Sequence, residues 1–318
     1  MICTILHTLR NKILHNCHGR AAMMVRMMFV CAYAALYVAC IFGVEFIASY
    51  AYYLAHTWGF DVLISYEYAG AVAALVGCVI LGIPHILHIC HGDAAFAYKI
   101  YAPELYVACG LSLFELISFI ASGEALGAYA AFSTARVVVL CVGIGFFEEL
   151  LFRGIIFHAL LRATKHRTHT FAISALLCSF VFGLAHIDFL GTNFADPIML
   201  AQAVGKILQA GLNSYMFCAI VYCTRSVCMT SMLHAINDCI LMLPASGLFG
   251  YEQDTVYVME GPEGVFTLVL YIILSLMLLY FCLRCNRLMK AYPKDACVHS
   301  EHVVAEAHDA SDADDTRL

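Results

Sequence analysis

Two adjacent carboxylates and a guanidinium interrupt a long apolar segment. The stretch GFFEELLFRGIIF, residues 145–157, places Glu148, Glu149 and Arg153 among apolar side chains. Glu149 and Arg153 are four residues apart, so on a helix they share one face and can form an ion pair. Glu148 is rotated by about 100° from that face. We therefore expect one acid to be structural and the other to be free for chemistry.

Two later apolar segments carry polar groups at the same four-residue spacing. The stretch FGLAH places Phe182 and His186 on one helical face, and HAIND places His234 and Asp238 on another, with Asn237 beside them. A carboxylate and two imidazoles supply a base, a second proton-handling group and a donor for a developing oxyanion. This is the minimum set for activating water.

The same groups could instead hold a zinc ion with one open position, and its ligands would be Glu148, His186 and His234. The residues leave open whether the chemistry uses zinc or no metal. A structural interpretation also competes, because single polar residues in membrane helices usually make contacts between helices. Charge in lipid is costly, so two acids, two histidines and an amide on three segments favour a hydrolytic or proton-handling site.

The composition places these segments in a membrane. Hydrophobic residues make up 63% of the 318 residues and charged residues 13%, against about 25% charged in soluble domains. The net charge of −6 gives no indication of nucleic-acid binding. We expect an all-α, polytopic bundle of about eight transmembrane helices. The expected spans are 27–54, 68–90, 103–122, 134–160, 171–190, 197–223, 227–244 and 264–283.

The basic residues predict the orientation of these spans. Lys and Arg fall almost entirely in loops on one side, as in the segment before the first span and the one after the last. We therefore expect a multi-pass protein, in the plasma (inner) membrane, with both termini cytoplasmic. The expected divisions are a basic cytoplasmic segment at 1–21, a membrane domain at 22–290 and a disordered acidic tail at 291–318.

The three motifs together resemble those of a known family. EELLFR fits the pattern EExxxR, FGLAH fits FxxxH and HAIND fits HxxxN/D. In this order on successive membrane segments they resemble the CAAX-protease and bacteriocin-processing family of intramembrane proteases, also called the Abi family. The resemblance covers the middle third of the chain. It implies an eight-helix fold and peptide-bond hydrolysis in a polar cavity, by a metalloprotease or a glutamate protease.

The resemblance also implies roles for the motif residues. Glu148 and His186 correspond to the pair that activates water, and Glu149 and Arg153 to a supporting ion pair. Phe182 corresponds to a packing residue near the site. His234 and Asp238 correspond to the pair that stabilises the oxyanion. Many relatives have Asn in place of Asp238, and an ionised Asp cannot donate a hydrogen bond. Either Asp238 is protonated, or it orients His234, or Asn237 is the donor.

A polar stripe on the sixth expected span could contribute to the same cavity. Gln202, Lys206, Gln209 and Asn213 lie on one helical face. Lys206 could offset the carboxylates, or the stripe could only pack the helix against its neighbours. The expected partners are membrane lipid and a peptide or membrane-protein substrate, of which a prenylated CAAX peptide is one. The alternatives to an endopeptidase are an inactive scaffold of the same fold and a proton-coupled transporter.

Overall fold

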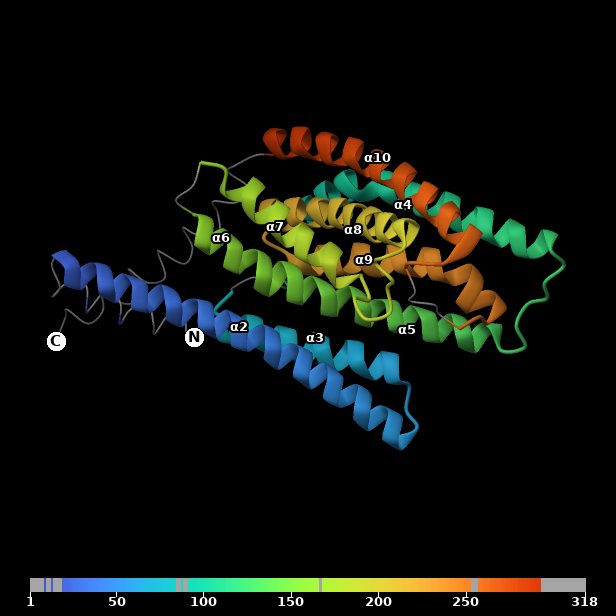
Figure 1. The fold of residues 1–318 in the computed structure, drawn as a ribbon, viewed down its shortest axis with the longest axis horizontal. Helices are drawn as coiled ribbons and strands as arrows, with labels where there is room; N and C mark the ends of the chain where they lie inside the picture. The colour runs from blue at the N-terminus through green and yellow to red at the C-terminus, as the bar shows by residue number, and fades with distance from the viewer. Residues whose placement is uncertain are drawn as a thin grey trace.

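The structure is a computed structural model that describes residues 9, 13, 19–83, 87, 91–165, 168–252 and 257–292. Every regular element in these ranges is helical (Figure 1). The predicted all-α bundle is therefore confirmed. Most of the expected terminal segments, 1–21 and 291–318, lies outside the described residues.

Within the described ranges the elements form eight apolar helical segments, and two of these segments include a π-helix. Seven are long and apolar enough to cross a membrane, and α7 is a shorter apolar helix. The elements are α2 Gly19–Trp58, α3 Val62–Ile80, α4 His91–Ala121, α5 Ala130–Glu149, π-helix η1 Leu150–Phe157, α6 His158–Thr164, α7 Thr170–Ala185, α8 Pro197–Thr224, α9 Val227–Met242, π-helix η2 Leu243–Phe249 and α10 Gly261–Ala291.

The second helix begins earlier than the expected span 68–90. Asp61 is its N-cap, and the Oδ1 atom of Asp61 accepts a hydrogen bond of 3.1 Å from the backbone N–H of Ile64. After its end at Ile80, Gly82 adopts a φ of +63°, which suits glycine. The cap and the glycine thus set a helix shorter and earlier than hydropathy alone predicts.

The fifth helix is shorter than the expected span 171–190. It ends at Ala185, and His186 is its C-cap. Shortly beyond it, the Oδ1 atom of Asp188 accepts hydrogen bonds from the backbone N–H groups of Leu190 and Gly191, at 3.0 and 2.9 Å. This local turn offers the backbone an alternative to helix, which explains the early end.

The segment formed by α5 and η1 runs through the middle of the bundle (Figure 1). It packs against α3 on one side and against α9 on the other, while α8 packs against α7 and α10. The helix pair α2–α3 lies on the side of α5 opposite to α4 and α10 (Figure 1). The three motif-bearing segments are therefore neighbours in the centre of the bundle.

Gly145 brings α5 and α9 into close contact just before the two glutamates. A Cβ atom at this position would lie 2.5 Å from the carbonyl oxygen of Ser231 and 2.9 Å from the backbone nitrogen of Ala235. Both are backbone atoms, so they cannot move away without shifting the helix. The missing side chain thus sets the distance between the helices that carry Glu148 and His234.

We expect Gly145→Ala to destabilise the protein by about 1–3 kcal/mol, because overpacking forces backbone shifts. Gly110→Ala is the matched control, since a Cβ atom at Gly110 meets nothing within 4 Å. Because alanine is a better helix former than glycine, we do not expect the control substitution inside α4 to destabilise the protein. Thermal unfolding in detergent measures both variants. Equal unfolding temperatures for the two would contradict the close contact.

Asp61 also pairs with Arg136 of α5 at the edge of the bundle. Partial burial acts to raise the pKa of Asp61, but the Arg136 guanidinium and the backbone N–H of Ile64 outweigh it and lower that pKa below its usual value. A carboxylate with a depressed folded-state pKa contributes stability above its unfolded pKa of about 3.9 and loses it as the pH falls through the folded value.

We expect Asp61→Asn to lower stability at pH 7 by up to about 1 kcal/mol, because asparagine keeps the helix cap but loses the ion pair. The difference from wild type should shrink as the pH falls through the folded-state pKa of Asp61, where Asp61 is itself protonated. Unfolding temperatures over a series of falling pH values measure this. A deficit that stays constant over the series would show that the charge of Asp61 is not the cause.

Candidate functional site

The EELLFR motif lies where an α-helix widens into a π-helix. Glu148 and Glu149 end α5, and Arg153 lies inside η1. Such wide turns are rare and occur often at functional sites. Side chains around η1 donate to three of its carbonyl oxygens, namely Cys78 to Leu150 at 3.8 Å, Cys178 to Phe152 at 3.4 Å and His158 to Arg153 at 2.7 Å.

Arg153 and Glu149 form the ion pair that their spacing predicts. The Nη1 atom of Arg153 lies 2.8 Å from the Oε1 atom of Glu149, and both side chains are fully buried. The guanidinium also lies over two aromatic rings, 4.4 Å from the centroid of Phe182 and 5.1 Å from that of Phe217. Phe182 thus packs on the ion pair, and its neighbours hold Arg153 in one position.

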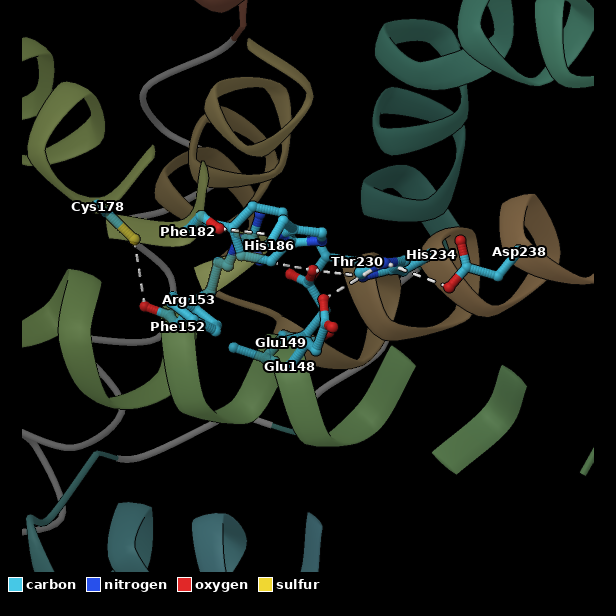
Figure 2. Close-up of polar contacts among 11 residues, drawn as sticks. Glu148, Glu149, Phe152, Arg153, Cys178, Phe182, His186, Thr230, His234 and Asp238 are labelled. Atoms are coloured by element: carbon cyan, nitrogen blue, oxygen red, sulfur yellow. Dashed lines mark hydrogen bonds and ion pairs between the residues drawn. The ribbon is translucent and has the colours of Figure 1, made fainter. Parts of the chain in front are cut away.

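His234 is the meeting point of three carboxylates (Figure 2). Its Nδ1 atom lies 2.9 Å from Oε1 of Glu149, and its Nε2 atom lies 3.7 Å from Oε2 of Glu148 and 3.5 Å from Oδ2 of Asp238. A carboxylate oxygen only accepts hydrogen bonds, so Nδ1 carries a proton. The Nε2 contacts are favourable when this nitrogen is protonated too, which makes it a donor directed toward the acids.

His186 follows the end of α7 and presents one free ring nitrogen. Its Nδ1 atom lies 2.8 Å from the carbonyl oxygen of Phe182, and a carbonyl oxygen only accepts, so Nδ1 carries the proton. The Nε2 atom of the neutral ring then has a lone pair. No hydrogen bond or ion pair joins His186 to Glu148 among the described residues, so the two can cooperate only through a molecule between them, such as a water.

The proposed zinc ligands do not form a metal site in this arrangement. The described residues contain no group of three or more His, Cys, Asp and Glu side chains placed to hold a metal ion. His234 is already engaged by Glu149 at Nδ1 and faces two carboxylates at Nε2. The set Glu148, His186 and His234 is therefore not supported as a zinc site, and we derive no chemical step through zinc.

The residues expected to support the site differ in the contacts that they make. Asn237 is buried beside Asp238, and its Oδ1 atom has no hydrogen-bond partner among the described residues. The ammonium of Lys206 lies 3.9 Å from the ring centroid of Tyr257, and Gln209 has a buried Oε1 atom without a hydrogen-bond partner in the described part of the chain. Gln202 of the same stripe instead binds the backbone of Met259.

Three residues near the site escaped the sequence prediction. Phe217 continues the polar stripe of α8, four residues after Asn213, so its position was available from the spacing. Glu67 of α3 interacts electrostatically with Glu148 and has a buried Oε2 atom without a partner among the described residues. It was missed because the expected span began at residue 68. Tyr257 lies in a loop without a motif.

The comparison with protein families agrees with the motifs. A family model described as type II CAAX prenyl endopeptidase Rce1-like matches residues 130–240. These residues run from the start of α5 into α9 and contain all three motifs. No curated protein matches the chain, and no solved structure matches it. The chain thus contains an Rce1-like domain at residues 130–240, consistent with the CAAX-protease and bacteriocin-processing family that its motifs indicate.

Proposed function

We propose that this protein is an intramembrane endopeptidase that hydrolyses a peptide bond of a membrane-associated substrate. The observation that carries the proposal is the arrangement around His234, where acids from α5 and α9 meet one imidazole inside a membrane-type bundle. Ionisable groups so placed are costly in lipid, which favours a catalytic role over simple packing. The Rce1-like match supports the same reaction class.

In the proposed reaction, Glu148 and His186 bind one water between them, and Glu148 accepts a proton as the water attacks the carbonyl carbon of the scissile bond. The developing oxyanion receives a hydrogen bond from Nε2–H of His234. Asp238, 3.5 Å from this nitrogen, orients the ring. The proton taken from the water then passes to the leaving amine as the carbon–nitrogen bond breaks.

This scheme gives Glu149 and Arg153 a supporting role. Glu149 is shared, because its Oε1 atom contacts both Arg153 and Nδ1 of His234. The guanidinium neutralises the carboxylate, and the carboxylate holds the Nδ1–H of His234, which orients the imidazolium and leaves its Nε2–H for the oxyanion. The activation of water is thereby assigned to Glu148 and not to its neighbour, whose charge is fully engaged.

The proposed substrate is a peptide or membrane protein that reaches the site within the lipid bilayer, and a prenylated CAAX-type peptide is one candidate. For the orientation, we infer that both termini are cytoplasmic. Arg162 of α6 and Lys290 of α10 belong to helices that end on the same side of the bundle, where α2 begins (Figure 1). Basic residues favour the cytoplasmic side. We propose the plasma (inner) membrane as the location.

The test is peptidase activity of the full chain, purified in detergent, on a mixed library of membrane and prenylated peptides. Wild type, Glu148→Ala and His186→Ala would be compared, with metal content measured on the same samples. We expect cleavage by wild type, loss in both variants, and activity that a chelator leaves unchanged. Cleavage that survives both substitutions would refute the assigned site, and loss on chelation would favour a metal that binds in another conformation.

A further inference from the structure

The segment at residues 257–259, just before α10, is fixed by three successive anchors. The carbonyl oxygen of Tyr257 accepts a hydrogen bond of 2.8 Å from the hydroxyl of Tyr271. The side chain of Val258 is buried in an apolar cluster with Ile187, Met199 and Ala203. The backbone of Met259 binds Gln202 twice, since its carbonyl accepts from Nε2 at 2.7 Å and its N–H donates to Oε1 at 2.9 Å. Three hydrogen bonds and one buried side chain thus fix this segment against its neighbours.

The anchors place the ring of Tyr257 against two groups of the site. Its centroid lies 5.7 Å from that of His186 and 3.9 Å from the Nζ atom of Lys206. The ring of Phe182 also contacts His186, with the centroids 4.6 Å apart. Two aromatic rings therefore contact the imidazole of His186. Phe182 belongs to α7, and Tyr257 belongs to the loop before α10.

Lys206 depends on the same ring. None of the ion pairs in the described ranges includes Lys206, so its closest favourable contact is the face of Tyr257, with Tyr271 farther away at 5.9 Å. Burial, together with the charges of Glu148 and Asp238, raises the pKa of Tyr257 well above its usual value. The phenol is therefore neutral and adds no charge beside the ammonium.

We infer that Tyr257 is a positioning residue of the active site, whose ring holds the imidazole of His186 against Phe182 and keeps the ammonium of Lys206 beside the carboxylates. The inference rests on the proposed peptidase function and extends it to a residue outside the family match at 130–240. It assigns the effect to the ring and not to the hydroxyl. A displaced His186 would no longer present Nε2 to the water that it shares with Glu148.

The test compares Tyr257→Leu, which removes the ring, with Tyr257→Phe, which removes only the hydroxyl. For cleavage of a peptide substrate we expect Tyr257→Leu to lower kcat about 10- to 100-fold with KM changed less than about threefold, and Tyr257→Phe to stay within about threefold of wild type in both. A full-activity Tyr257→Leu protein, or a Phe variant as impaired as the Leu variant, would overturn the assignment.

A second readout does not depend on activity. Diethyl pyrocarbonate modifies accessible imidazoles, and mass spectrometry reports the rate at His186, with His158 as an internal control because it is bound to the carbonyl of Arg153. We expect faster modification of His186 in Tyr257→Leu alone and no change at His158. An unchanged rate at His186 would overturn the inference even if wild type cleaves no peptide, whereas absent cleavage with the expected labelling would overturn only the proposed function.

If Tyr257→Leu does not fold, modification at His158 will rise as well. Tyr271→Phe is then the variant that decides, because it removes one hydrogen bond to the carbonyl of Tyr257 and keeps every ring. We expect a smaller increase in the modification of His186 than full removal of the ring would give. The same rate as wild type would show that the anchored segment does not control the position of His186.

Discussion

Glu148→Gln should lower kcat/KM for peptide cleavage by about 10²–10⁴-fold, the range found when a general base is removed. Glutamine keeps the size of the side chain and its contact with His234, but an amide cannot accept the proton of the attacking water. The loss should appear in kcat, because the substitution removes a proton acceptor that acts in the transition state. Steady-state kinetics of the purified variant measure it.

The matched control for this substitution is Glu115→Gln in α4. Glu115 is also an acid inside a membrane-type helix, and no hydrogen bond or ion pair in the described residues connects it to the site. We expect its kinetics to equal those of wild type. An equal loss in the two variants would mean that the effect comes from membrane insertion or folding, and Glu148 would lose its assignment as the base.

Arg153→Leu should destabilise the protein by about 3–5 kcal/mol, the cost of removing one partner from a buried ion pair. Glu149 would keep its charge with only His234 beside it. Phe182 and Phe217 would each lose the contact between their ring and the guanidinium. Thermal unfolding in detergent with a thiol-reactive dye measures the loss, because buried cysteines such as Cys178 become accessible on unfolding.

Two comparisons separate the ion pair from a general loss of charge. The double variant Glu149→Gln with Arg153→Leu should be less destabilised than the sum of its single variants, since it leaves no unpaired acid. Arg136→Leu removes a partly exposed partner of Asp61 and should cost only about 0–1 kcal/mol. Additive effects in the double variant would contradict a direct interaction between Glu149 and Arg153.

The sequence predicted the helical bundle and the geometry of the ion pair because both follow from local rules. Membrane helices are recognisable by length and hydropathy, and side chains four residues apart meet on one face of a helix. Glu149 and Arg153 therefore pair as expected, and so do His234 and Asp238. The roles of these residues in catalysis stay predictions until activity is measured.

Contacts between segments far apart in the sequence could not be predicted, because no local spacing rule connects such residues. The link between Glu149 and His234 joins residues 85 positions apart, and the ring of Tyr257 reaches His186 from a loop. Hydropathy also misplaced helix ends wherever a polar side chain decided them, as Asp61 does for α3. Glu67 was missed for this reason. The second span was expected to begin at residue 68, so Glu67 was assigned to a loop, although it lies within α3.

The π-helix η1 also makes the length of this segment a constraint of its own. A π turn contains about one residue more than an α turn, so deleting one residue in η1, such as Gly154, would allow regular α-helix to form. The extra residue is taken up within the wide turn, so the helix on either side would keep nearly the same phase. Arg162, whose Nη1 atom donates to the hydroxyl of Tyr37 at 2.8 Å, would then stay near that partner. The deletion would instead disturb the turn that carries Arg153, where Cys78, Cys178 and His158 donate to the carbonyl oxygens. A deletion in the regular helix of α5 would have the opposite effect, because it would rotate the residues on its two sides by about 100° relative to each other.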